Sequence, residues 1–237
     1  MSTSIKKISP IRQNDKIEQI LSFIHNYIIE GNLQPGTALP SEKELSGQLG
    51  VSRFSLREAL RVAQAQGLID ISQGKKPVVA HPSSAPAASL MKLAIMRISR
   101  SFFDLAIARA GLESAIARIA AIRITDEDLM RLEENIKLME ITGRDISYYV
   151  DKDAEFHNII LNSTESIVFE IMISSVNELL RESRKATLKS GGIERACSAH
   201  FAIYEALKKH DPDSSEAAMR IHLKNAEEDL KALGLSN

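Results

Sequence analysis

Four residues in the second half of the chain are of the types that coordinate metal ions. Asp153 and His157 lie four residues apart in "DKDAEFHNII", so on a helix their side chains lie one turn apart on the same side. His200 and His222 each lie among apolar residues, in "CSAHFAIYEAL" and "AAMRIHLKNAEE". One carboxylate and three imidazoles suit a divalent ion, with zinc as the first choice and nickel, manganese or iron as alternatives.

Each of these residues also has an ordinary structural interpretation. Asp153 and His157 can form a local contact on one helix, and a histidine on an apolar face can be a hydrogen-bonded core residue. The spacing does not show whether the three helices converge. The other histidines (His25, His81 and His210) lie in predicted turns or in the other domain, which favours a shared site for the three inward-facing ones.

The composition predicts an ordinary globular protein. The 237 residues are 44% hydrophobic and 26% charged, with a net charge of −1, so the whole molecule is not a general polyanion binder. The single cysteine, Cys197, excludes an internal disulfide and fits a reducing compartment. No apolar run approaches the roughly 20 residues of a spanning helix, and "MSTSIKKISP" lacks a signal-peptide core. We therefore expect a cytoplasmic protein with no membrane contact.

The first 80 residues predict a winged helix-turn-helix. Apolar residues at helical spacing from Ile17 to Ile28 predict a first helix that ends near Gly31. Ser41 and Glu44 have the spacing of a capping box, and this second helix ends at Gly50. A third helix begins after Ser52 and ends near Gly67, and the apolar stretches on either side of "QGKK" predict a two-stranded hairpin.

In such a motif the N-terminus of the third helix meets base edges in the major groove. Lys43 on the preceding helix can reach the DNA backbone, and Lys75 and Lys76 lie at the wing tip, where cations follow phosphates. The alternative is that these lysine and arginine side chains make no DNA contact and only solvate the surface of a small domain. Hydroxyl and guanidinium groups occupy the start of the third helix, at Ser52, Arg53, Ser55 and Arg57.

Downstream of "AHPSSAPAAS", residues 80–89, nearly all of the sequence has helical periodicity. We expect a DNA-binding domain at 9–80, a linker at 81–89 and an all-α antiparallel bundle of six or seven helices at 90–237. The fold class is thus mainly α, with the winged helix joined to this bundle. The periodic segments run over 89–123, 126–141, 146–162, 165–189, 194–209 and 214–233.

Residues 31–69, with the turn "QPG" and the motifs "LPSE", "LGVSR" and "REAL", resemble the winged helix of the GntR family of bacterial transcription regulators. Lys43 stands where an arginine is usual, and Phe54 stands where a small polar residue is common, so Phe54 can pack on a thymine methyl or change the half-site preference. The wing "QGKKPVV" also departs from the usual Gly-x-Gly-Thr. The resemblance and the basic wing together imply DNA contacts by Lys43, Ser52, Arg53, Phe54, Ser55, Arg57, Gly74 and Lys75.

The segments that carry the four candidate ligands resemble those of the FCD domain, the all-α effector domain of the FadR subfamily of GntR regulators. The resemblance implies that Asp153, His157, His200 and His222 bind the metal. It also implies that Arg109, in the pattern "ARAGLE" with Glu113, pairs with an acidic effector; a plain helix contact between these two residues is the alternative. Arg181 and Arg184 are weaker candidates for the same role.

These features predict a homodimeric transcription regulator that binds a palindromic operator and responds to a small carboxylate metabolite bound beside the metal. One alternative is a regulator for which the ion itself is the signal. Another is a metal-dependent enzyme with a DNA-binding appendage, although no second base accompanies the ligands: Glu155 is expected to face away from the side that carries Asp153 and His157.

Overall fold

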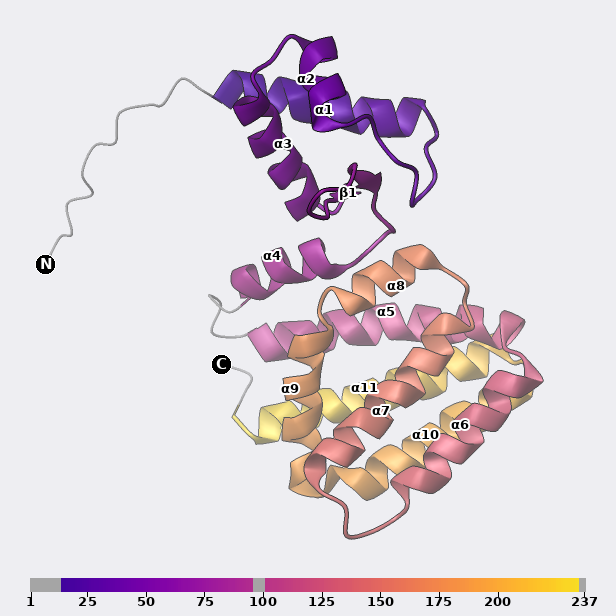
Figure 1. Cartoon of the computed structure of the whole chain (residues 1–237). Coiled ribbons are helices and arrows are strands. Elements are labelled where there is room, and N and C mark those ends of the chain that lie inside the picture. The colour runs from indigo at the N-terminus through magenta and orange to yellow at the C-terminus, as the bar shows by residue number, and fades with distance from the viewer. Residues whose placement is uncertain (1–13, 96–100, 235–237) are drawn as a thin grey trace, which may run out of the picture. The chain divides into compact units, whose positions relative to one another are not determined.

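A computed structural model describes residues 14–95 and 101–234 of the chain (Figure 1). The chain divides into two compact units, Met1–Pro86 and Ala87–Asn237. The first residues of the expected DNA-binding domain, 9–13, lie outside the described residues, as do 96–100 and 235–237. Each unit has a hydrophobic core of its own.

The first unit contains three helices, α1 (Asn14–Glu30), α2 (Glu42–Leu49) and α3 (Arg53–Ala65). The predicted capping box at the start of α2 is present, because the backbone N–H of Glu44 donates to Oγ of Ser41 at 3.3 Å. In return, the backbone N–H of Ser41 donates to Oε2 of Glu44 at 2.7 Å. These two bonds satisfy donors that the first turn of a helix otherwise leaves free.

A short turn joins α2 to α3. Gly50 has φ of 63°, a left-handed conformation that glycine adopts without steric cost. Two residues later Ser52 caps α3, because its Oγ accepts from the backbone N–H of Ser55 at 3.1 Å. The predicted helix-turn-helix is therefore confirmed.

A hairpin completes this unit. Strands β1 (Ile69–Asp70) and β2 (Val78–Val79) pair in antiparallel fashion with Ile69 opposite Val79, and Ala38 forms a further bridge to Val78. The seven residues between the strands form the predicted wing. The core beneath α1, α3 and the hairpin consists of Ile20, Ile24, Ile28, Leu39, Leu45, Leu56, Ala59, Leu60, Ala63, Ile69 and Val79.

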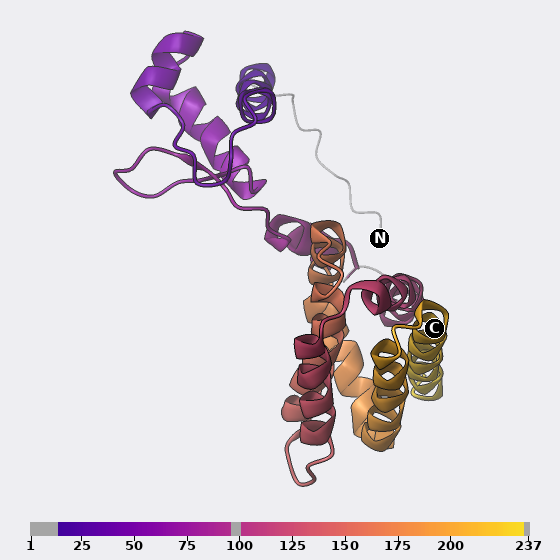
Figure 2. The same ribbon diagram turned by 90° about the vertical axis from the view of Figure 1, so that its right-hand side faces the viewer.

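From Ala85 onward the described residues form eight α-helices and one π-helical turn, with no strand. Most of the helices lie side by side, as Figure 2 shows. The mainly α fold expected for this part is confirmed. In chain order the elements are α4 (Ala85–Ile95), α5 (Ser101–Arg123), α6 (Asp126–Met139), α7 (Ile146–Asn162), α8 (Ile167–Ser174), α9 (Asn177–Thr187), η1 (Leu188–Gly192), α10 (Ile193–Lys208) and α11 (Pro212–Ala232).

The two longest helices, α5 and α11, make the most extensive contact in this unit. Three alanines of α5 are fully buried and let the helix axes approach closely: Ala117, Ala120 and Ala121. Helices α7 and α10 supply larger side chains to the same core, among them Phe156, Ile159, Ile160, Ile203 and Leu207. The candidate metal ligands are therefore carried by helices that a continuous core holds in place.

Two of the periodic segments that we expected to be single helices consist of more than one element. Segment 89–123 comprises α4 and α5, with 96–100 outside the described residues, and segment 165–189 comprises α8, α9 and the first residues of η1. Between α8 and α9, Val176 has φ of −116° and ψ of 5°, which interrupts the helix. Hydrophobic periodicity continues across this break because both helices face the same core.

The segment that we expected to be a linker, 81–89, contains the first turn of α4. Pro86 lies in this turn, where proline is tolerated because its missing N–H has no helical partner. Ser83 precedes the helix, and its Oγ accepts from the backbone N–H of Ala85 at 3.1 Å. Residues 81–84 of the expected linker thus precede the helix, and residues 85–89 belong to α4.

No helix among the described residues combines the length and the apolar character needed to cross a membrane.

Candidate metal centre and nucleic-acid interface

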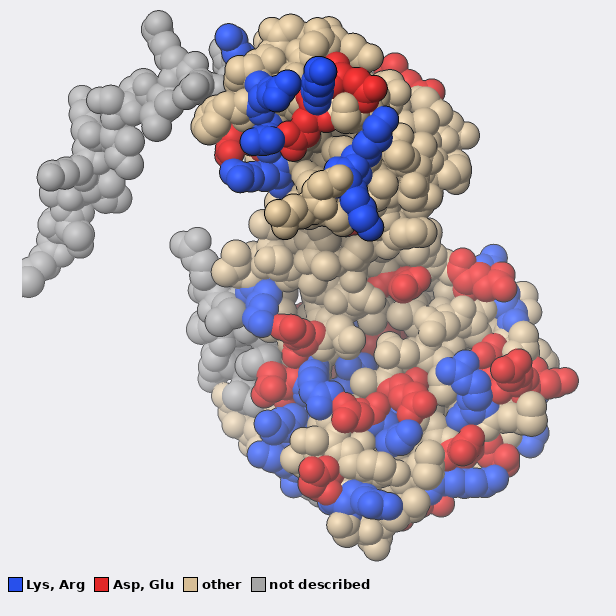
Figure 3. Space-filling view, viewed as in Figure 1, with Lys and Arg blue, Asp and Glu red and all other residues tan. Residues whose placement is uncertain are grey.

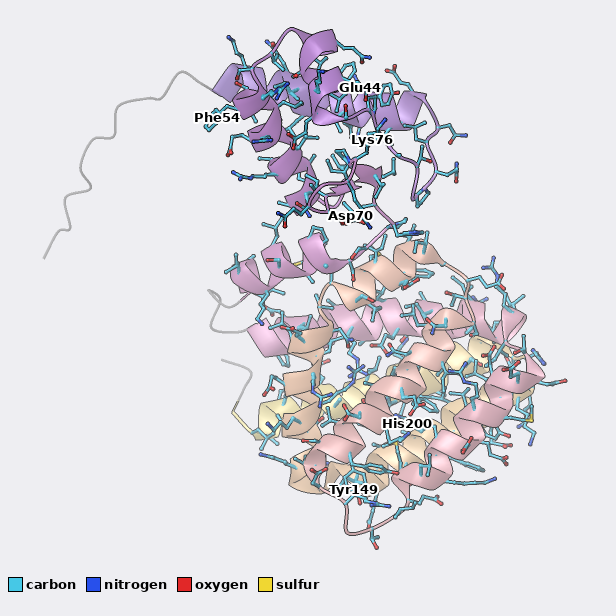
Figure 4. All side chains as sticks on the ribbon, viewed as in Figure 1. Glu44, Phe54, Asp70, Lys76, Tyr149 and His200 are labelled. Carbon is cyan, nitrogen blue, oxygen red and sulfur yellow. The ribbon has the colours of Figure 1, made fainter. Side chains whose placement is uncertain are left out.

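Asp153, His157, His200 and His222 come together inside the helical unit. Helix α7 carries the first two, α10 carries His200 and α11 carries His222. All four are buried, and one candidate ligand atom from each lies within 4.8 Å of the others. Figure 4 shows His200 between the helices of this unit. The three helices that carry these residues therefore converge, which the spacing in the sequence does not show.

Individual distances describe a compact donor cluster. Nε2 of His157 lies 3.2 Å from Nε2 of His222 and 3.9 Å from Oδ2 of Asp153. Nε2 of His200 lies 3.3 Å from Oδ1 of Asp153. The ring of His200 also stacks on Phe156, with centroids 3.8 Å apart and an interplanar angle of 4°, which fixes the plane of the imidazole.

The donor set fits a divalent ion. Both ring nitrogens of His200 are buried; Nε2 approaches Oδ1 of Asp153, whereas Nδ1 makes no hydrogen bond within the described part of the chain. A buried polar atom without a partner is costly, so Nδ1 calls for a partner that protein groups do not supply. Three imidazoles and one carboxylate within 4.8 Å are donors that zinc and related ions accept.

The protonation states also favour a metal. Burial lowers the pKa of His157 to about 4 and lowers the pKa of His222 well below its usual value. Burial alone would raise the pKa of Asp153, but the contacts with His200, His157 and Arg184 outweigh it and hold this pKa well below the usual range. At neutral pH the site therefore presents His157 and His222 without a proton charge and Asp153 as a carboxylate, the forms that bind metals.

A second layer of buried charges surrounds the cluster. Nδ1 of His157 lies 2.6 Å from Oε2 of Glu113, and Nε of Arg184 donates to Oδ2 of Asp153 at 2.7 Å. Nε of Arg109 donates to Oε1 of Glu113 at 2.5 Å. Carboxylate partners of this kind fix the tautomer and the orientation of a metal-binding histidine.

Arg109 makes the helix contact that its sequence context left open, but this contact does not use the whole guanidinium group. Its Nε makes the helix contact with Glu113, while its Nη2 is buried without a hydrogen-bond partner. Arg184, a weaker candidate from the sequence, contacts Asp153 and also has an unpaired buried nitrogen, Nη1. Arg181 is different, because it forms an ion pair with Asp151 at the exposed surface.

Both buried arginines line a small cavity of about 30 Å³ beside the cluster. A cavity of this size holds about one water molecule. Asp153 and His222 reach the cavity from the metal side, and the remaining lining comes from α9, η1, α10 and α11. The arrangement places two guanidinium groups with free donors beside the candidate metal ligands.

The candidate DNA contacts lie on the first unit. Arg53 and Phe54 are exposed at the start of α3, and Phe54 retains 68% of its accessible surface (Figure 4). Lys43 and Lys75 are also exposed. Gly74 lies in the wing with φ of 74°, a left-handed conformation that favours glycine. Figure 3 shows lysine and arginine side chains gathered on one face of this unit.

Other predicted contacts have partners within the protein. Ser52 and Ser55 are engaged in the cap of α3, with their hydroxyl oxygens 2.9 Å apart. Nε of Arg57 donates to Oε2 of Glu42 at 2.7 Å, and Lys76 approaches Glu44 at 3.5 Å. These ion pairs are exposed, and exposed pairs contribute little stability, so DNA phosphates can replace the carboxylates.

Sequence reasoning missed several of these residues. Glu113 was considered only as a helix neighbour of Arg109, and its contact with His157 joins helices α5 and α7. Phe156 directly precedes His157 in the sequence. This adjacency does not predict that the ring of Phe156 stacks on the ring of His200, because the stacking depends on how α7 and α10 cross.

Comparison with known proteins agrees with the fold. The model of the family "Bacterial regulatory proteins, gntR family" matches residues 16–79, and the FCD domain model matches residues 104–225, which include all four candidate ligands and Arg109. The chain is 28% identical to the transcriptional repressor NanR of Cronobacter sakazakii over 229 residues, covering 90% of this chain and 85% of NanR. It is 29% identical to the Glc operon transcriptional activator of Escherichia coli K12 over 231 residues, covering 92% and 90%.

Among solved structures, GntR of Streptococcus agalactiae superposes with a TM-score of 0.63 at 24% sequence identity, covering 90% of this chain and 99% of that protein. At this identity the likeness concerns the fold alone. The matching family and the relatives are transcription regulators rather than enzymes. The chain belongs to the GntR family of bacterial transcription regulators, and its C-terminal unit carries an FCD domain.

Proposed function

We propose that this protein is a dimeric regulator whose affinity for a palindromic operator is set by a small carboxylate metabolite bound beside a divalent ion. The observation that carries the proposal is the buried cluster of Asp153, His157, His200 and His222 next to two buried guanidinium groups with free donors. As a DNA-binding protein, it would act in the cytoplasm.

Charge balance supports an acidic effector. The carboxylates of Asp153 and Glu113 balance the guanidinium groups of Arg109 and Arg184, and histidines with lowered pKa values add no charge. A divalent ion held by the four candidate ligands supplies two positive charges and, when six-coordinate, positions for ligand oxygens. The buried site then has an excess of positive charge, which favours an anionic ligand.

The free nitrogens of the two arginines are suited to the same ligand. Nη2 of Arg109 and Nη1 of Arg184 have no partner in the described part of the chain, and both residues line the cavity. A guanidinium group binds a carboxylate through charge-assisted hydrogen bonds. Arg109 and Arg184 are therefore our candidates for effector binding, so Arg184 ranks beside Arg109 rather than below it.

On the DNA side, we propose that the start of α3 enters the major groove and that the wing follows the backbone. Arg53 and Phe54 are the candidates for base contacts because both are exposed there. Lys43, Arg57 and Lys75 are the candidates for phosphate contacts. GntR-family regulators bind operator DNA and typically dimerise, and a two-fold dimer requires a palindromic site.

A second candidate function is direct metal sensing. The small cavity favours it, because about 30 Å³ leaves no room for an organic acid unless the wall moves. In that case the ion alone would order α7, α10 and α11 and set the affinity for DNA. The relatives include a repressor and an activator, and an ion that sets the affinity for DNA can serve either kind of regulator.

The test starts from native mass spectrometry of protein purified from its host, which reports subunit number, metal and any retained acid together. Operator binding is then measured for metal-free protein, zinc-loaded protein, and zinc-loaded protein with a panel of organic acids. Our proposal expects the acid to change operator affinity of the zinc-loaded form alone. If zinc alone changes the operator affinity of the metal-free protein and no acid changes it further, the ion is the signal.

A further inference from the structure

We infer that Arg195 and Asp229 form a latch at the outer wall of the cavity, and that Arg195 is the residue that selects effectors with a second anionic group. The inference rests on the proposed function, since it assumes an acidic ligand beside the metal cluster. Arg195 lies on α10 and Asp229 on α11, and Nη2 of Arg195 donates to Oδ1 of Asp229 at 2.7 Å.

The cations that line the cavity differ in exposure. Arg109 and Arg184 lie on the side of the metal cluster and retain 8% and 3% of their accessible surface. The side chain of Arg195 retains 56%, so this residue forms the side of the cavity that meets solvent. A ligand that enters from solvent therefore meets Arg195 first and the two buried arginines afterwards.

The wall beside the latch is tightly packed. The π-helical turn η1 (Leu188–Gly192) connects α9 to α10, and π-helical turns occur frequently at functional sites. A Cβ atom on Gly192 would lie 2.4 Å from the carbonyl oxygen of Thr187 and 4.0 Å from Oδ2 of Asp229. The approach to the backbone of Thr187 is close enough that only glycine fits, and Asp229 lies at van der Waals distance from the same position.

The latch explains how a small cavity can admit an acid. With about 30 Å³ available, a carboxylate ligand requires the wall to move, and the side chains of Arg195 and Asp229 are a part of the wall that can rearrange while α10 and α11 stay packed. Arg195 is exposed, so its pair with Asp229 is weak and readily exchanged. An incoming carboxylate offers Arg195 the same charge and the same hydrogen-bond geometry as Asp229 does.

Two anchoring points follow from this geometry. One anionic group would bind at the cluster, where Arg109 and Arg184 have free donors, and a second would replace Asp229 on Arg195. A monocarboxylate can satisfy the first anchor but has no second group to take the place of Asp229 on Arg195. We therefore expect dicarboxylates to bind more tightly than monocarboxylates of the same chain length.

The test compares matched acids on the zinc-loaded full chain by isothermal titration calorimetry. The pairs are malonate and propionate, succinate and butyrate, and glutarate and pentanoate. At least one dicarboxylate should bind about tenfold more tightly than its partner, the value of one charge-assisted hydrogen-bonded contact. Arg195→Gln should abolish this preference with unchanged zinc content, and Asp229→Asn should strengthen dicarboxylate binding because Arg195 is then unpaired.

Arg220→Gln is the matched control, because Arg220 is an exposed arginine of α11 in an ion pair with Glu216. It should leave all affinities unchanged. If the acids bind and Arg195→Gln keeps the preference for dicarboxylates, or no dicarboxylate exceeds its partner, the latch is refuted while the effector function stands. If no acid binds the zinc-loaded protein, both the latch and the proposed acidic effector are refuted.

Discussion

Glu113→Gln tests whether the metal site depends on a residue that is not itself a candidate ligand. Oε2 of Glu113 lies 2.6 Å from Nδ1 of His157, which favours a proton on Nδ1 and leaves Nε2 free to face the cluster. An amide in place of the carboxylate can donate to Nδ1 instead. The proton then moves to Nε2, and His157 loses the lone pair that a metal requires.

The expected magnitude has two parts. Loss of a carboxylate that orients a metal-binding histidine typically costs about 10–100-fold in metal affinity, so we expect the zinc Kd to rise by this factor. The substitution also leaves the buried guanidinium of Arg109 without its anion, and breaking a buried ion pair costs about 3–5 kcal/mol. Because the amide oxygen still accepts a hydrogen bond, we expect the metal-free protein to lose about 1–3 kcal/mol.

The assay is zinc titration in the presence of a competing chelator, with the fold of the metal-free protein checked by circular dichroism. Glu155→Gln is the matched control, since Glu155 lies on the same helix as His157 and is 46% exposed, in contact with Lys152 and Asn135. A folded Glu113→Gln protein with the zinc Kd of the parent would refute the orienting role of Glu113. An equal loss in Glu155→Gln would show that the effect is not specific to the site.

Four further outcomes are expected. Arg53→Ala should weaken operator binding about tenfold or more in a gel-shift assay and leave the zinc content unchanged; unchanged affinity would refute the assignment of the start of α3. His200→Ala should lower bound zinc, measured by elemental analysis, well below one ion per subunit, and full occupancy would refute the ligand set. The metal-free protein should become easier to unfold with urea as the pH falls from 7 to 5. Burial lowers the pKa of His157 from 6.5 to about 4, so in this range the unfolded chain binds a proton that the folded chain excludes, and the free energy of unfolding falls by up to about 1.4 kcal/mol per pH unit. A free energy of unfolding that does not change with pH would contradict this. Glu178→Gln removes the ion pair from α9 to Lys92 of α4, so it should reduce the effect of a bound acid on operator affinity while zinc content stays the same; an unchanged effect would exclude this contact from the coupling.

The fold of the first unit follows from local signals. Ser41 and Glu44 form the predicted cap, Gly50 ends α2, and Ser52 begins α3, because each of these effects acts within a few residues. The break between α8 and α9 at Val176 was missed for the opposite reason. No glycine or proline marks it, and the apolar pattern is set by the core that both helices share rather than by the continuity of the helix.

In the candidate metal site, the sequence indicated which residues can coordinate a metal ion but not which charged residues surround them. Asp153 and His157 share one helix, so their spacing is visible, whereas Arg184 reaches Asp153 from α9 and Glu113 reaches His157 from α5. These contacts depend on helix crossings that periodicity does not encode. They nevertheless carry the argument for an acidic effector: without Arg184, Arg109 alone would balance one of the two carboxylates, and the excess positive charge that a divalent ion brings to the buried site would fall from two to one.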